Sequence, residues 1–97
     1  MLVVYKYEIP MTDTFDLTIE EGARILHFEE QRGVLYIWVL VDLAAKDKEV
    51  RSFNMVHTGE FLNTTWCPGV EMGAIYVGTT LCKGDIQLHL FELGGSR

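Results

Sequence analysis

Two segments of the chain share one layout, and this layout restricts the fold more than any other feature. Residues 22–42, GARILHFEEQRGVLYIWVLVD, and residues 73–93, GAIYVGTTLCKGDIQLHLFEL, both begin Gly-Ala and reach a second glycine eleven residues later. A glycine takes a positive φ without steric cost, so each segment predicts a β-hairpin that turns at Gly33 or Gly84. Whether they arose by duplication or convergence, two such hairpins can bury their apolar sides by packing face to face.

The other segments favour strands as well. Residues 2–9, LVVYKYEI, alternate with period 2 and end at Pro10, which cannot donate into a β-ladder. Residues 14–19 also alternate, although a helix over 14–22 is the competing interpretation. In the segment 50–59 the expected core face carries Phe53 and Met55. The chain therefore predicts an all-β fold, a small antiparallel β-sandwich or partly open barrel of six to seven strands. Residues 1–93 form its single domain and 94–97 a flexible tail.

The most apolar segment is VLYIWVLV at residues 34–41. An unbroken run of strand-forming residues predicts a central strand that is covered on both faces. We accordingly expect Trp38 and Phe91 to contribute to the core. In the strand before the first turn, alternation puts Ile25 on one face and Leu26 with Phe28 on the other.

Composition limits the classes of partner. The 97 residues carry 14 acidic and 8 basic side chains, a net charge of −6, which argues against direct nucleic-acid binding through phosphates. The negative charge serves either solubility or docking on a basic protein surface. The eight-residue apolar run is too short to span a bilayer, and the start of the chain lacks the pattern of a signal peptide. Cys67 and Cys82 are most simply free thiols of a reducing cytosol.

We find no arrangement of residues that predicts catalysis, a metal or a cofactor. His27, His57 and His89 lie thirty or more residues apart and form no metal-binding pair. The chain is therefore expected not to be an enzyme. The candidate binding residues at the end of the strand 50–57 and in the following loop, which are expected to line a small-molecule pocket, are His57, Thr58, Glu60 and Trp66. The alternative is a turn with an aromatic plug.

Six short motifs, in order along nearly the whole chain, resemble a family of small uncharacterised proteins of tailed phages and prophages. They are YKYEI, GARIL, WVLVD, HTG, YVGT and HLFEL. The resemblance implies a phage protein that works in the cytoplasm of the host bacterium. It brings no established activity and no site residues.

Together, these expectations predict a non-catalytic phage accessory protein that acts by binding, in host takeover or against host defence. Its partner would be a host bacterial protein, blocked through an acidic surface, or a small nucleotide signal. Holding a phosphate requires several converging cations, and Arg24 and Arg51 are among the few available, so that version requires an oligomer. The alternative is a structural or assembly protein of the virion. A homo-oligomer is expected in either case, because the apolar terminal strand 2–9 has an unprotected edge.

Overall fold

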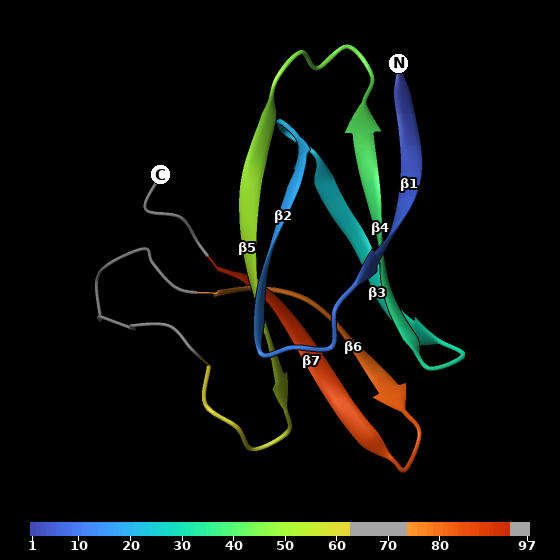
Figure 1. The fold of residues 1–97 in the computed structure, drawn as a ribbon, viewed down its shortest axis with the longest axis vertical. Helices are drawn as coiled ribbons and strands as arrows, with labels where there is room; N and C mark the ends of the chain where they lie inside the picture. Colours follow the sequence, from blue (N-terminus) through green and yellow to red (C-terminus); the bar gives the residue numbers. More distant parts are fainter. Residues whose placement is uncertain (63–73, 94–97) are drawn as a thin grey trace.

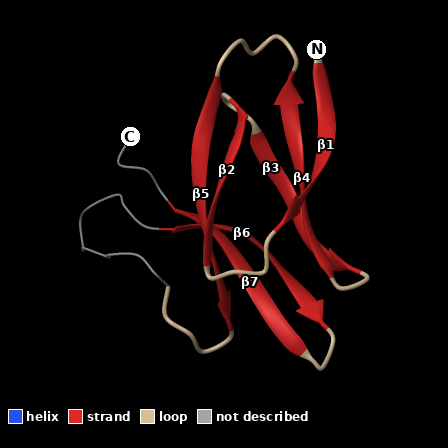
Figure 2. Ribbon diagram, in the orientation of Figure 1, coloured by secondary structure: helices blue, strands red, loops and turns tan. Residues whose placement is uncertain are grey.

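The computed structural model describes residues 1–62 and 74–93, which form seven strands and contain no helix (Figures 1 and 2). Trp66, most of the loop 59–72 and the tail 94–97 lie outside the described residues. The strands are β1 (Leu2–Ile9), β2 (Thr14–Glu20), β3 (Arg24–Gln31), β4 (Val34–Asp42), β5 (Lys48–His57), β6 (Ala74–Cys82) and β7 (Ile86–Leu93).

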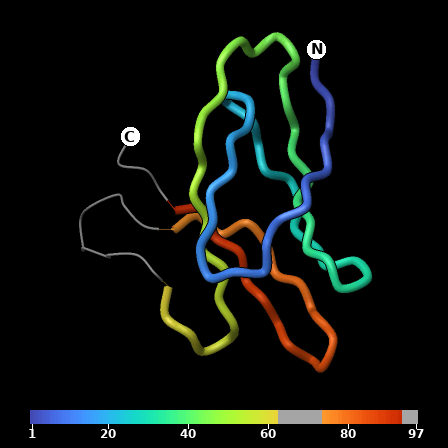
Figure 3. The backbone as a smooth tube through the Cα atoms, in the orientation of Figure 1, coloured from blue at the N-terminus to red at the C-terminus, as the bar shows by residue number. Residues whose placement is uncertain are grey.

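The strands pair in two antiparallel sheets. The first sheet has the order β1-β4-β3 and the second has the order β2-β5-β7-β6. The two predicted hairpins, β3-β4 and β6-β7, thus belong to opposite sheets, and Figure 3 shows their turns at the lower end of the view. Residues 14–20 are a strand rather than a helix. The predicted all-β sandwich is confirmed.

One face of each sheet builds a shared core. Along β4 every second residue is fully buried, and Phe53 and Met55 of β5 meet them from the second sheet as predicted. Phe15 of β2 stacks on Phe53 with ring centroids 5.1 Å apart. The buried apolar side chains of the core are Ile9, Ile19, Ala23, Phe28, Leu35, Ile37, Val39, Val41, Phe53, Met55, Leu88 and Leu90.

Three expectations about the faces of the strands were wrong. The outer face of β4 is only partly covered, so Trp38 is partly exposed, and Phe91 is likewise partly exposed on the outer face of β7. Among the described elements, none packs over the outer side of the three-stranded sheet. In β3 a bulge between Ile25 and His27 shifts the alternation. Phe28 consequently joins Ile25 at the core, and Leu26 is exposed.

The two sheets approach each other closely where β3 and β6 run side by side. A Cβ built on Gly78 of β6 would lie 3.3 Å from the Cβ of Phe28, a tight contact, so any larger residue at position 78 would require the two strands to shift by a few tenths of an ångström. Two residues further along both strands, the Glu30 amide donates to Thr80 Oγ1 over 2.9 Å. The Thr80 side chain thus takes the place of a backbone hydrogen bond between β3 and β6, which are edge strands of the two sheets.

The opposite side of the sandwich, between β1 and β2, is held more loosely. The hydroxyl of Tyr7 donates to Glu20 Oε1 over 3.4 Å across this gap. Burial, followed by the nearby Glu20 carboxylate, raises the pKa of Tyr7 above its ordinary value, because both disfavour a phenolate. Tyr5 packs edge-on against Tyr7 with ring centroids 6.2 Å apart and remains 39% exposed.

The β3-β4 turn carries local backbone strain. Gln31 pairs with Val34, so the loop consists of Arg32 and Gly33, with φ angles of 55° and 82°. Positive φ at both positions is the geometry of a type I′ turn, which favours Asn-Gly. The Gly33 amide donates to Glu30 Oε2 over 2.7 Å and helps to close the turn. Arginine is an unfavourable residue for this left-handed position.

We therefore expect Arg32→Asn to raise the free energy of unfolding by up to about 1 kcal/mol, because asparagine adopts a left-handed backbone more readily. Urea unfolding followed by circular dichroism measures the change. Arg32→Ala is the matched control, since it removes the same guanidinium without easing the backbone. Equal stability of the two variants would show that the conformation of residue 32 contributes nothing.

Candidate functional site

At the end of β5, where the pocket is predicted, the described residues His57–Glu60 form a turn. The Glu60 amide donates to the His57 carbonyl over 3.0 Å, and Gly59 supplies the positive φ of 93°. The Glu60 carboxylate accepts from the His57 amide over 2.6 Å and lies 2.9 Å from His57 Nδ1. The hydrogen bond from the His57 amide and, to a smaller extent, the contact with the His57 side chain lower the pKa of Glu60 below its ordinary value. A cleft of about 410 Å³ touches Glu60 but is lined mainly by other residues, among them Asp13 and Phe61.

Thr58 belongs to a different cluster. Its hydroxyl lies 2.8 Å from His89 Nε2, and the other ring nitrogen of His89 lies 2.9 Å from Thr79 Oγ1. The Tyr76 hydroxyl extends this row, 2.7 Å from Thr79 Oγ1. The row crosses the exposed outer face of β5, β7 and β6. The sequence did not reveal it, because Thr58 and His89 meet only through the register that sets Val56 opposite His89.

Arg51 lies in a buried ion pair at the other end of β5. Its Nε and Nη2 donate to the two carboxylate oxygens of Glu92, over 2.5 and 2.9 Å. Nη1 donates to the Ala23 carbonyl over 2.5 Å and lies 3.4 Å from Glu49 Oε2. The pairing with Glu92 raises the pKa of Arg51, outweighing the opposing effect of burial. The guanidinium charge is therefore compensated within the protein.

Of the predicted site residues within 1–62 and 74–93, Arg24 shares a cleft with Arg51. This cleft of about 410 Å³ opens between the starts of β3 and β6, with the Arg51–Glu92 pair among its lining residues. Arg51 and His57 are six residues apart on one strand, a span of roughly 20 Å at the usual rise per residue. The candidate residues that the structure describes thus lie in separate places.

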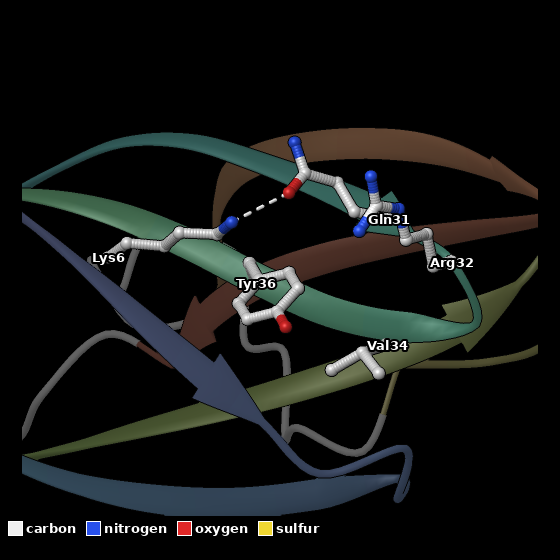
Figure 4. Close-up of a pocket in the computed structure, with 5 residues that line it drawn as sticks. All are labelled: Lys6, Gln31, Arg32, Val34 and Tyr36. Carbon is white, nitrogen blue, oxygen red and sulfur yellow. Dashed lines mark hydrogen bonds between the residues drawn. The ribbon is translucent and has the colours of Figure 1, made fainter.

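The outer face of the first sheet carries a surface that the sequence analysis missed. Lys6 of β1 lies over the Tyr36 ring, with Nζ 4.1 Å from its centroid, and 5.4 Å from the Trp38 centroid (Figure 4). Its ammonium also donates to Gln31 Oε1 over 2.7 Å. A cleft of about 630 Å³ runs beside these groups and is lined by Lys6, Gln31, Arg32, Val34 and Tyr36.

The pairing of the strands extends this surface. Lys6 and His27 flank Trp38 from the two neighbouring strands, and Val4 and Arg24 flank Leu40 in the same way. The His27 and Trp38 rings lie 5.3 Å apart, and His27 Nε2 lies 2.9 Å from Glu29 Oε1. We call the following outward side chains of β1, β4 and β3 the aromatic face: Val4, Lys6, Glu8, Arg24, His27, Glu29, Gln31, Val34, Tyr36, Trp38 and Leu40.

Two features are absent from the part of the chain that the structure describes. In residues 1–62 and 74–93 no three His, Cys, Asp or Glu side chains gather as metal ligands would, and no helix there is long and apolar enough to cross a membrane. Cys82 is a free thiol. Burial and, to a smaller extent, the Glu30 carboxylate raise its pKa, which disfavours the nucleophilic thiolate.

Comparison with known proteins gives a family. A family model described as Domain of unknown function (DUF7352) matches residues 1–96, nearly the whole chain. Neither the curated proteins nor the solved structures contain a match to this chain.

Proposed function

Because the chain belongs to this family, the Domain of unknown function (DUF7352), we propose a function from its surface: a non-catalytic protein that docks on a protein partner through the aromatic face. The observation that carries the proposal is the placement of Tyr36 and Trp38, which are partly exposed at the centre of the three-stranded sheet. Tyrosine and tryptophan at the centre of a surface are the residues that most often dominate the energy of protein interfaces.

The surroundings of these rings suit a protein better than a small ligand. Val4 is 50% exposed and widens the apolar centre along β1. Charges of both signs, including Lys6, Arg32 and Glu29, surround it. An apolar centre within a polar rim is the usual anatomy of a protein interface. The cleft of about 630 Å³ beside Tyr36 has room for a side chain that protrudes from a partner.

A nucleotide signal is the less favoured ligand. Sequestering a phosphate needs several converging donors whose charge is free. Arg51 already donates to both oxygens of Glu92, and Lys6 is held over two rings by Gln31. On the aromatic face, Glu8 and Glu29 both lie across from Tyr36 and would repel an anion placed there. We therefore favour the protein-blocking version of the hypothesis.

The resemblance to small phage proteins supports a setting for this activity. We propose that the protein acts in an infected bacterium, in the cytoplasm, as an accessory protein of host takeover or anti-defence that binds a host protein. A structural or assembly role in the virion is the alternative, since it uses the same kind of surface. The presence of the chain in purified virions would favour that alternative.

The test compares two surface aromatic residues in one experiment. Tagged wild-type protein is expressed in bacterial cells and captured together with its partner. The partner is then purified and titrated with wild type and with each variant by calorimetry. Trp38→Ala is expected to raise the dissociation constant at least about tenfold, equivalent to about 1.4 kcal/mol.

Tyr76→Ala is the matched control, because Tyr76 is 57% exposed on the outer face of the other sheet. It should leave the affinity unchanged. Docking through the aromatic face would be contradicted if the partner bound Trp38→Ala as tightly as wild type, or if Tyr76→Ala alone weakened the binding. Circular dichroism of each variant verifies that it is folded.

A further inference from the structure

The edge of β1 is open to pairing. Among the described strands β1 pairs with β4 alone, and Figure 1 shows it at the outer side of its sheet. The Leu43 amide donates to the Met1 carbonyl over 2.9 Å, which fixes the hydrogen-bonding pattern of this antiparallel pair. Odd-numbered residues of β1 therefore point their backbone groups at β4. The amides and carbonyls of Leu2, Val4, Lys6 and Glu8 point away from the sheet.

The second sheet has a comparable free edge at β2, but its side chains are unsuited to self-pairing. The Met55 amide donates to the Asp13 carbonyl, so Thr14, Asp16, Thr18 and Glu20 direct their backbone groups outward. The four side chains are polar, and two are carboxylates that would repel their copies across a two-fold axis. The outward residues of β1, in contrast, include Leu2 and Val4, which are 63% and 50% exposed.

We propose that two copies of this chain pair antiparallel through their β1 edges, which joins their three-stranded sheets into one six-stranded sheet. The strand is long enough for it and has no bulge, since all of Leu2–Ile9 pairs in continuous register with β4 and Pro10 lies beyond its end. Edges of this kind, without a bulge or proline, are the ones that pair with other chains. A two-fold axis relates the same surface of both copies, so the free backbone groups of both β1 edges form hydrogen bonds in one interface. The pairing does not depend on the proposed docking function.

The two-fold axis has few positions available to it. The outward backbone groups belong to even-numbered residues, so even-numbered residues of one copy must lie opposite even-numbered residues of the other. Near the middle of the strand, this places the axis at residue 4, 5, 6 or 7. At residue 6 it would set Lys6 against its own copy, and at residues 4 and 7 the strands overlap less. An axis at Tyr5 pairs residues 2–8 with residues 8–2 and opposes no like charges. It sets Val4 opposite Lys6 and brings the two exposed Tyr5 rings together, a favourable cross-strand pair.

The first experiment uses proline as a probe of the edge. Val4→Pro removes an amide that points away from β4, so the monomer keeps its ladder and the dimer loses hydrogen bonds. Thr18→Pro is the matched control, because it removes the equivalent outward amide from the β2 edge. Light scattering after size exclusion at micromolar concentrations is expected to give a dimer for wild type and for Thr18→Pro, and a folded monomer for Val4→Pro. A wild-type monomer, or a Val4→Pro dimer, would overturn the proposal.

A cross-link tests the register. In a background of Cys67→Ser and Cys82→Ser, Tyr5→Cys places the new thiol next to its own copy at a non-hydrogen-bonded pair, where the Cα atoms lie about 4.5 Å apart. Mild oxidation is expected to give a covalent dimer with Tyr5→Cys and none with Val4→Cys, whose thiol faces Lys6. The reverse result would refute an axis at Tyr5.

Discussion

Glu92→Leu is expected to lower the free energy of unfolding by about 3–5 kcal/mol, because it leaves the Arg51 guanidinium buried without its carboxylate. Arg51 and Glu92 are each only 9% exposed, so water would replace the lost carboxylate only in part. Urea unfolding measures the change. The exposed pair of His27 and Glu29 supplies the control, since Glu29→Leu should cost at most about 1 kcal/mol.

A second variant keeps this prediction testable if Glu92→Leu fails to fold. The double variant Arg51→Met with Glu92→Leu removes both charges and fills the site with apolar groups, which is often neutral or stabilising. It should recover at least half of the loss. A double variant that is as unstable as the single one would show that the charge pair is not the origin of the effect.

Phe28→Ala is expected to be about as damaging, with a loss of about 3–5 kcal/mol, because it leaves a cavity in the core. Phe28 is 1% exposed and lies where β3 passes Gly78 of β6. The two strands are already in close contact there, so they cannot move together to fill the space. For a domain of this size each kcal/mol lowers the melting temperature by roughly 4–8 °C.

Phe91→Ala is the comparison for this experiment. Phe91 is also an aromatic residue in a strand, but it lies on the outer face of β7 against Tyr76, with ring centroids 5.6 Å apart. Its removal leaves no closed cavity and should cost clearly less than the removal of Phe28. Similar losses for both variants in calorimetry would contradict the assignment of Phe28 to the core.

Local patterns in the sequence were enough to predict the strands and the turns of the two hairpins. Gly33 and Gly84 both have positive φ, as hairpins that pivot on them require. The alternation around Phe53 and Met55 correctly predicted which side of β5 packs in the core, although Asn54 and Val56 on the other side are buried as well. These features depend on neighbours within a few residues, which a sequence pattern records directly.

The errors arose where the outcome depends on distant parts of the chain. An unbroken apolar run looks the same whether a second layer covers it or not, so the exposure of Tyr36 and Trp38 could not be predicted from residues 34–41. The bulge at Leu26 has no glycine or proline to announce it. Arg51 was a candidate ligand contact, but its partner Glu92 lies 41 residues away and is reached only when β5 pairs with β7.

The arrangement of strands also decides when the chain can fold during synthesis. β1 has no partner until β4 leaves the ribosome, and β5 needs β7, the last of the described strands to be made. Such distant pairings are typical of all-β domains that fold in roughly milliseconds to seconds. Until residues 86–93 emerge, Phe53 and Met55 of a nascent chain lack their neighbours on β7, Glu92 and Leu90, and this edge of β5 is open to a chaperone that holds apolar segments.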